Sequence, residues 1–259
     1  MILPKKKRPA IKIDPKRLLL FGAPKCGKTT ILSALDDCLI VDMEEGSDYV
    51  EAAVVKVNSM ADFAALIKAL KDDMKANGGR KPYKTIALDT LTALEELSLE
   101  LAIKDYKASP MGTNYVGTDI RTLPNGAGYG WTRPAFFKML KAFEPFCDTL
   151  VMIGHIKEKD ITKAGDILTE KSINLTGKTK DILCAWADSI GLVYREETKT
   201  YIDFCPSESL VVGSRQAHLR GAKIVVAESD EENNITVDWG LVFLEPAREE
   251  EVEETLVKK

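Results

Sequence analysis

The stretch GAPKCGKTT, residues 22–30, decides the fold of this chain. It follows an apolar run at residues 18–21 that is typical of a buried strand, and it leads into a helical pattern at residues 28–36. Its letters match a phosphate-binding loop, in which glycines let the backbone turn so that N–H groups at the helix start face the phosphates. A strand, this loop and a helix in succession predict a nucleotide-binding α/β domain.

Two residues of the loop have specific expected roles. Lys28 reaches the β- and γ-phosphates of a nucleoside triphosphate, and the Thr29 hydroxyl is placed to ligate Mg²⁺. The remaining residues are expected to surround the phosphates: Gly22, Ala23, Pro24, Lys25, Cys26, Gly27 and Thr30. Cys26 fits a small filler better than an oxidation-sensitive thiol. ATP and Mg²⁺ are therefore the expected cofactors.

The composition is that of a globular protein. The chain has 259 residues, of which 45% are hydrophobic and 29% charged, enough to bury a full core. Its net charge of -4 argues against a uniformly basic nucleic-acid binder but leaves a local basic groove open. No apolar run reaches the ~20 residues that cross a bilayer, and the five cysteines form no CxxC pair. We expect a cytosolic protein with reduced thiols and no membrane partner.

Short apolar runs alternate with helical patterns, which predicts a mainly parallel sheet flanked by helices. Buried strands are expected at residues 18–21, 38–42, 54–57, 85–89 and 149–154, and helices at 28–36, 60–77, 91–106, 134–146 and 180–187. Residues 189–194 and 200–204 are typical of a hairpin, which makes the C-terminal extension antiparallel. Two stretches between these elements lack periodicity: a long loop at 108–132 and a polar loop or hairpin at 157–168.

The ends of the chain differ in composition from the middle. We expect a flexible basic tail at residues 1–16 and a charged tail at residues 246–259. Between them, residues 17–245 are expected to form one ATPase domain.

Polar residues lie at the ends of three predicted strands. Asp89 is the expected carboxylate ligand of Mg²⁺, unless it only caps the next helix. Glu44 is a candidate base for activating water, with a solvated acidic turn as the alternative. His155 can sense the γ-phosphate or have a purely structural role. Because parallel strands end at one edge of a sheet, all three are expected to meet the phosphate loop there.

Four segments together resemble the ATPase core of the RecA and RadA family, most closely the compact RecA-like ATPases of bacteriophages associated with single-strand annealing and recombination. They are residues 22–29, 40–44, 85–94 and 150–155, within a resemblance that covers residues 17–195. The resemblance implies ATP hydrolysis with Glu44 as the catalytic glutamate, and His155 as the phosphate sensor where recombinases more often carry Gln. It implies a cytoplasmic location, in the bacterial host if the protein is phage-encoded.

In RecA-like proteins the loops after the metal-binding and sensor segments line a DNA channel. The resemblance therefore implies single-stranded DNA as a partner and, beside it, a single-strand binding protein. Aromatic faces and cations of these loops are the expected DNA contacts: Arg121, Tyr129, Trp131, Arg133, Lys157, Lys159 and Lys178. The alternative is that the aromatic residues are local packing and the lysines are solvated.

An arginine near the C-terminus can project into a neighbouring subunit's site, as in ATPases that share their sites. We favour Arg215 for this role, with a surface ion pair as the alternative. Such a residue implies a homo-oligomer, either a ring or a filament. Only about 16 residues precede the first expected strand, so the resemblance does not include the domain that recombinases use to polymerise.

Two other functions compete with a DNA-binding ATPase. One is a nucleotide-switched ATPase that acts on a protein partner, such as a helicase loader or a packaging factor. The other is a small-molecule kinase, which shares the phosphate loop. The kinase is the weakest of the three because the sequence has no Arg-rich lid helix and because Glu44 suits water activation better than a phosphate-acceptor clamp.

Overall fold

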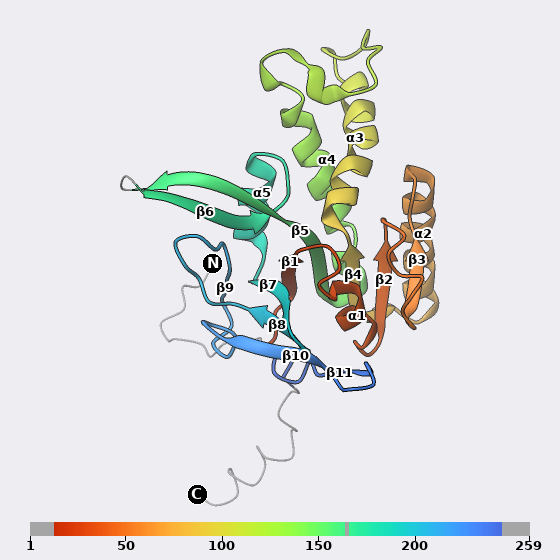
Figure 1. Ribbon diagram of the computed structural model, residues 1–259. Coiled ribbons are helices and arrows are strands. Elements are labelled where there is room, and N and C mark those ends of the chain that lie inside the picture. The colour runs from red at the N-terminus through yellow and green to blue at the C-terminus, as the bar shows by residue number, and fades with distance from the viewer. Residues whose placement is uncertain (1–12, 164–165, 245–259) are drawn as a thin grey trace, which may run out of the picture.

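The computed structural model describes residues 13–163 and 166–244. Apart from residues 13–16, the two predicted tails lie outside the described residues. One sheet runs through the described part of the chain (Figure 1). Its parallel strands are β1 (Arg17–Gly22), β2 (Cys38–Asp42), β3 (Ala53–Lys56), β4 (Tyr83–Asp89), β5 (Cys147–Lys163) and β7 (Ser189–Glu196).

An antiparallel part extends the sheet beyond β7. It consists of β8 (Lys199–Asp203), β10 (Lys223–Ser229) and β11 (Ile235–Val237), while β9 (Gly213–Ser214) pairs with β7 and β6 (Asp166–Ile173) pairs with β5. The strand order is β11-β10-β8-β7-β1-β5-β4-β2-β3. The predicted fold class, a mainly parallel α/β sheet with an antiparallel C-terminal extension, is therefore confirmed.

The helices are α1 (Lys28–Ser33), α2 (Met60–Ala76), α3 (Leu91–Lys107), α4 (Tyr129–Lys141) and α5 (Lys178–Trp186), with short 3-10 turns at Ile120–Thr122, Pro124–Gly126 and Glu144–Phe146. Side-chain caps begin two of them, because the Ser59 and Thr90 hydroxyls accept backbone N–H bonds at the starts of α2 and α3. No helix in the described part is long and apolar enough to cross a membrane.

Two apolar layers fill the space on either side of the sheet. Alternate residues of β1 face opposite sides, so Leu19 and Phe21 join one layer and Leu18 and Leu20 the other. The first layer is covered by α2, α3, α4 and α5. The second is covered by α1 and by the C-terminal segment, where Trp239 donates its indole N–H to the Ile31 carbonyl at 2.8 Å. A sheet covered on both faces explains the near-continuous apolar runs of its central strands.

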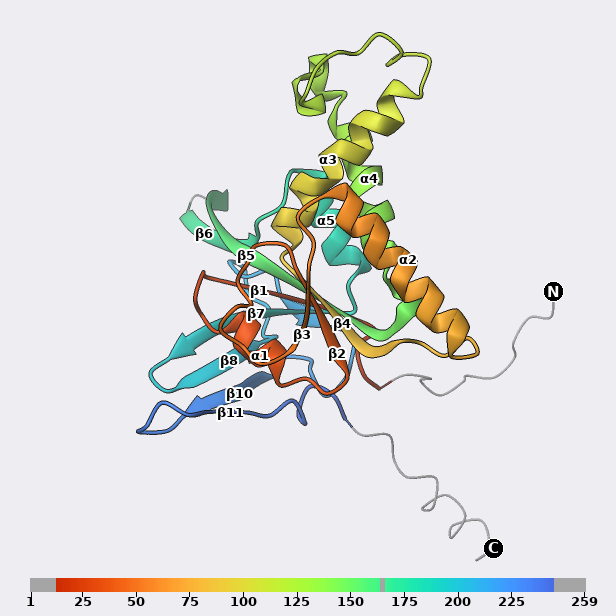
Figure 2. The same cartoon turned by 90° about the vertical axis from the view of Figure 1, so that its right-hand side faces the viewer.

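Two parts of the molecule project from the sheet (Figures 1 and 2). The helices α3 and α4 pack side by side and extend beyond the sheet, carrying the segment between them at their far end; we call residues 91–141 the helical arm. The second projection is the hairpin of β5 and β6, in which Ile156 pairs with Ile173 and the pairing continues to the turn. The polar stretch after His155 is thus a hairpin.

Four predicted boundaries are wrong by three residues or more. One is the end of the helix expected to reach residue 146, which lies at Lys141. The strand that was expected to end at residue 154 continues to Lys163, because β6 pairs with it beyond the parallel sheet and satisfies its backbone groups. The helix expected to start at Pro134 starts at Tyr129, so Pro134 lies inside α4 and Tyr129 and Trp131 are helical. The first helix ends at Ser33 instead of residue 36.

Candidate active site

Four neighbouring strands of the sheet deliver the predicted site residues to one edge. The order β1-β5-β4-β2 places β5 between the strand before the phosphate loop and the strand that ends in Asp89. In register, Gly22 lies opposite His155, and Asp89 lies opposite Asp42. The parallel strands therefore bring residues from four distant segments together, as expected from the carboxyl-edge rule.

The phosphate loop turns sharply between β1 and α1. Gly22 must be glycine because a Cβ there would lie 2.2 Å from the Val193 carbonyl oxygen of β7. Gly27 has a φ of 95°, a left-handed conformation that glycine adopts without strain. The turn thus depends on close packing at its first residue and on backbone freedom at its sixth.

Lys28 is buried and folds back over the loop. Its Nζ atom donates to the carbonyl oxygens of Gly22 at 3.1 Å and Ala23 at 2.7 Å. The Cys26 thiol lies beside it, 3.8 Å from the Lys28 Nζ atom, and donates to the Val193 carbonyl at 3.5 Å. Burial raises the pKa of Cys26, against the effect of the nearby ammonium group. Cys26 is therefore a small buried residue that packs the loop against β7.

A cavity of about 340 Å³ opens in front of the loop. Of the predicted nucleotide-binding residues, Pro24, Lys25, Gly27, Lys28, Thr29 and Thr30 line it, together with Glu44, Asp89 and His155. Gly22, Ala23 and Cys26 are not among the lining residues and instead contact the Lys28 Nζ atom. Sequence reasoning missed Tyr49 and Val50, which also line the cavity. Tyr49 is 96% exposed, and a single aromatic residue in an irregular loop gives no periodic signal.

Thr29 and Asp89 form the part of the site that suits a divalent cation. The Thr29 hydroxyl donates to the Asp89 Oδ2 atom at 2.7 Å, which places two hard oxygen atoms side by side. Burial raises the pKa of Asp89, and the charges of Asp42 and Glu44 raise it further. A bound Mg²⁺ would offset this unfavourable negative charge, and one or two protein oxygens plus phosphates are its usual ligands in nucleotide sites. The two residues therefore fit Mg²⁺.

Asp42 organises the loop that carries Glu44. Its carboxylate accepts hydrogen bonds from the backbone N–H groups of Glu44 at 2.9 Å and Ser47 at 3.0 Å, and from the Ser47 hydroxyl. Burial alone would raise the pKa of Asp42, but these hydrogen bonds outweigh it and lower the pKa. An ionised Asp42 thus holds the loop in shape beside the cavity.

Glu44 is held from two sides. The Thr90 hydroxyl donates to Glu44 Oε1, and His155 Nε2 lies 2.9 Å from Glu44 Oε2. The other ring nitrogen of His155, Nδ1, is buried and has no hydrogen-bond partner among the described residues. The structure thus brings Glu44 and His155 together at the cavity, while their roles as base and sensor stay predictions.

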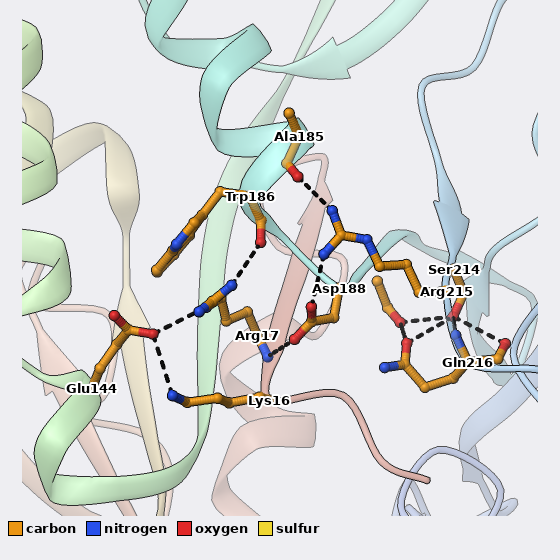
Figure 3. A network of polar contacts seen from close by, with 10 residues as sticks. Lys16, Arg17, Glu144, Ala185, Trp186, Asp188, Ser214, Arg215 and Gln216 are labelled. Atoms are coloured by element: carbon orange, nitrogen blue, oxygen red, sulfur yellow. Dashed lines mark hydrogen bonds and ion pairs between the residues drawn. The ribbon is translucent and has the colours of Figure 1, made fainter. Parts of the chain in front are cut away.

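Arg215 lies beside Asp188, in a network of polar contacts that also includes Arg17 at the start of β1 (Figure 3). Its guanidinium group contacts Asp188 at 3.1 Å and the Ala185 carbonyl at 2.6 Å. The preceding residue, Ser214, pairs with Ser189 at the start of β7, whereas the phosphate loop follows the end of the parallel strand β1. Arg215 thus faces away from the cavity of its own subunit, and this ion pair is the alternative that the sequence left open. A role in a neighbouring subunit stays a prediction.

The predicted DNA contacts divide into two groups. In the helical arm, Trp131 packs against Tyr106 with ring centroids 5.3 Å apart, and Arg121 pairs with Asp119 and Glu96. Tyr129 is 41% exposed, and Arg133 is half-buried. The lysines of the second group are exposed: Lys157 and Lys159 on the hairpin, and Lys178 at the start of α5. Within the described residues Arg133 makes no ion pair, and its Nε atom is buried without a hydrogen-bond partner. The lysines of the second group are therefore the exposed cations without an ion pair among these predicted contacts.

This fold and cavity define a class of protein, the P-loop nucleoside triphosphatases, in which the loop after the first strand holds the phosphates. A family model described as the AAA domain matches residues 14–222. The chain therefore belongs to the AAA domain family of P-loop ATPases. No curated protein was found to match the sequence. The family match ends at Ala222, before β10 and β11.

Proposed function

We propose that the protein is a RecA-like, Mg²⁺-dependent ATPase that binds single-stranded DNA in phage-type recombination, annealing or replication. The observation that carries the proposal is the continuity of β5. One residue of this strand, His155, lines the phosphate cavity, and the next residues form the exposed, lysine-bearing hairpin. Because β5 belongs to both the phosphate cavity and the hairpin, it would link the bound nucleotide directly to the bound DNA.

The cavity supports hydrolysis by an activated water. Lys28 is placed to contact the β- and γ-phosphates, and Thr29 and Asp89 would hold Mg²⁺, which neutralises charge that develops on the phosphates. Glu44 accepts a proton from water as the water oxygen attacks the γ-phosphorus, and the bond to the bridging oxygen of ADP breaks. Each carboxylate oxygen of Glu44 still has a free lone pair beside its bond to Thr90 or His155.

Tyr49 is suited to contact the nucleotide base. Its side chain is almost fully exposed at the rim of the cavity, on the loop that follows Glu44. An aromatic face binds a base by stacking, and this interaction tolerates different bases. Tyr49 would thus add affinity for the nucleoside without selecting strongly among nucleotides.

The hairpin and the start of α5 form the proposed DNA surface. Lys157 and Lys159 are two residues apart on one strand, so both point to the same side of the hairpin. Neither makes an ion pair within the described residues, whereas Lys171 on the opposite side pairs with Glu158 at 3.5 Å. Free cations on one side of the hairpin are suited to track a phosphate backbone.

Binding of fluorescent oligo-dT with and without AMP-PNP and Mg²⁺ tests this function. At low salt, where phosphate contacts are strongest, we expect binding that depends on the nucleotide. Double-stranded DNA of the same length is the control for single-strand preference. An oligo-dT affinity that is undetectable in both nucleotide states would refute the DNA-binding part of the proposal.

A nucleotide-switched ATPase for a protein partner is the second candidate. The specific observation in its favour is apolar exposure on both projections: Ile167 on the hairpin is 74% exposed, and Met111 and Val116 on the helical arm are 74% and 92% exposed. Apolar side chains at projecting ends fit a protein surface better than a phosphate backbone. Nucleotide binding without any DNA binding would favour this candidate.

A further inference from the structure

The segment between the hairpin and α5 is fastened to the edge of the sheet that carries the cavity. The Asn174 N–H donates to the His155 carbonyl at 2.8 Å, and the Asn174 carbonyl accepts a hydrogen bond from the Thr92 hydroxyl at 3.3 Å. Two residues further, Thr176 donates to the Glu95 carboxylate. This short segment, residues 174–176, thus touches both β5 and the first turns of α3.

Glu95 makes the most extensive of these contacts. The Thr176 N–H lies 3.1 Å from both carboxylate oxygens, and the Thr176 hydroxyl lies 3.1 Å from Oε2. Burial raises the pKa of Glu95, although the hydrogen bonds from Thr176 oppose this effect. The next residue, Glu96, is exposed and pairs instead with Arg121 at 2.7 Å. Glu95 is therefore partly buried and links α3 to the segment before α5, unlike a solvated side chain on a helix surface.

The same helix also reaches the cavity. It begins immediately after Asp89 and Thr90, and the Thr90 hydroxyl contacts Glu44. Glu95 lies five residues after Thr90, which is about 7.5 Å along a rigid α-helix. The first turns of α3 therefore connect the proposed base and metal ligand to the segment that leads into α5, and Figure 1 shows α3 starting at the end of β4, beside β5.

We propose that Glu95 and Thr176 form a joint that couples the nucleotide in the cavity to the β5–β6 hairpin and α5. This inference rests on the proposed function, in which the cavity binds ATP. Glu95 is a positioning residue: it contacts no reacting atom and acts through Thr176. A shift of Asp89, Thr90 or Glu44 on nucleotide binding moves the start of α3, and the joint transmits this movement to the residues that carry the free lysines.

Hydrogen–deuterium exchange measured by mass spectrometry on the full chain, with and without AMP-PNP and Mg²⁺, tests the joint. In the wild type we expect AMP-PNP to change the exchange of two regions, residues 22–30 in the phosphate loop and residues 166–178 in the hairpin and the start of α5. Glu95→Gln should keep the first change and weaken the second, because the neutral amide offers one acceptor oxygen in place of two charged ones. Glu96→Gln, on the adjacent exposed residue, is the matched control and should keep both.

A second variant separates coupling from folding. Thr176→Val removes the hydroxyl donor and keeps the backbone N–H. It should therefore reduce, without abolishing, the AMP-PNP-dependent change in hydrogen–deuterium exchange at residues 166–178. The AMP-PNP affinity and basal ATP turnover of Glu95→Gln should stay within about twofold of the wild type. The ratio of oligo-dT Kd values without and with AMP-PNP is about 5- to 150-fold for a typical coupled pair of sites. In Glu95→Gln this ratio should fall toward one.

The outcomes distinguish the joint from the function on which it rests. Exchange at residues 166–178 that responds to AMP-PNP equally in the wild type and Glu95→Gln would overturn the joint, as would a wild-type response confined to the phosphate loop. No response at residues 22–30 in the wild type would overturn nucleotide binding and the joint with it. Loss of DNA binding alone would refute only the DNA partner, since the exchange experiment contains no DNA.

Discussion

Glu44 and His155, which are 111 residues apart in the chain, lie in contact, with the Glu44 Oε2 atom 2.9 Å from the His155 Nε2 atom. Glu44 follows the end of β2, and His155 lies within β5, where the parallel pairing of β5 with β1 ends. The strand β4 lies between β2 and β5 and delivers Asp89. Their side chains are 34% and 28% exposed, so water and a γ-phosphate can reach both. In the proposed function, the carboxylate is the base and the imidazole is the group that responds to the γ-phosphate.

Replacing His155 tests whether this contact matters for hydrolysis. In His155→Ala we expect ATP turnover to fall by about 10- to 100-fold, because a hydrogen bond to a charged group contributes ~1.5–3 kcal/mol. The affinity for AMP-PNP should change little. The control is His218→Ala, since His218 bonds the Val242 carbonyl far from the cavity. Equal turnover in both variants would show that His155 is only structural.

Without bound Mg²⁺, the ionised Asp89 should lower the free energy of unfolding. Because burial raises the pKa of Asp89 above its ordinary value of 3.8, the folded protein holds this proton more tightly than the unfolded chain. Without Mg²⁺, the Asp89 contribution to the free energy of unfolding therefore falls as the pH rises from 3.8 through the raised pKa. In EDTA at pH 7, Asp89→Asn should melt at a higher temperature than the wild type.

The same variant should lose the extra thermal stabilisation that Mg²⁺ gives in the presence of AMP-PNP. A ligand at 100 times its Kd raises the free energy of unfolding by about 2.7 kcal/mol, and thermal melting curves of the wild type measure the resulting rise in Tm. A Mg²⁺-dependent shift of wild-type size in Asp89→Asn would exclude Asp89 as a metal ligand.

Tyr49→Ala should weaken nucleotide binding without slowing hydrolysis at saturation. Stacking on a base contributes ~1–3 kcal/mol, so the Kd for AMP-PNP should rise by about 5- to 150-fold while kcat stays the same. Tyr129→Ala serves as the matched control, because Tyr129 is also exposed but lies on the helical arm. Isothermal titration of both variants checks the prediction, and equal affinities would remove Tyr49 from the site.

The hairpin lysines should contribute to the salt dependence of DNA binding. For a single strand, each phosphate contact adds about 0.7 to the slope of log K against log salt, so replacing both Lys157 and Lys159 by Ala should lower the slope by roughly 1.4. Replacing the exposed α2 residues Lys68 and Lys71 is the control for overall charge. An unchanged slope in the hairpin variant would place the DNA elsewhere.

Much of the site could be predicted because it follows from strand ends. The phosphate loop carries its own pattern, and the rule that parallel strands end at one edge is enough to bring Asp89, Glu44 and His155 to it. The Thr29 hydroxyl and the Asp89 carboxylate, the two proposed metal ligands, lie 2.7 Å apart. The positions of these residues follow from the order and direction of the strands, which the apolar runs in the sequence predict.

Other features depend on contacts that no local pattern encodes. Tyr49 reaches the cavity because Asp42 shapes an irregular loop, and the pairing of Arg215 with Asp188 links residues 27 positions apart. The strand β5 extends to Lys163 because it pairs with β6. The polar sequence of this hairpin has no apolar pattern that would predict the pairing. Sequence periodicity reports burial, and these segments are exposed or irregular.

The direct test of an ATP-hydrolysing site at this cavity is the turnover of ATP with Mg²⁺ by the wild type and by Glu44→Gln. Loss of the base should lower kcat by about 100-fold or more, while the Kd for ATP stays within a few-fold of the wild-type value. Lys28→Ala, which should lose both binding and turnover, is the reference for a disabled site. Wild-type turnover in Glu44→Gln, or turnover that survives in Lys28→Ala, would contradict this assignment.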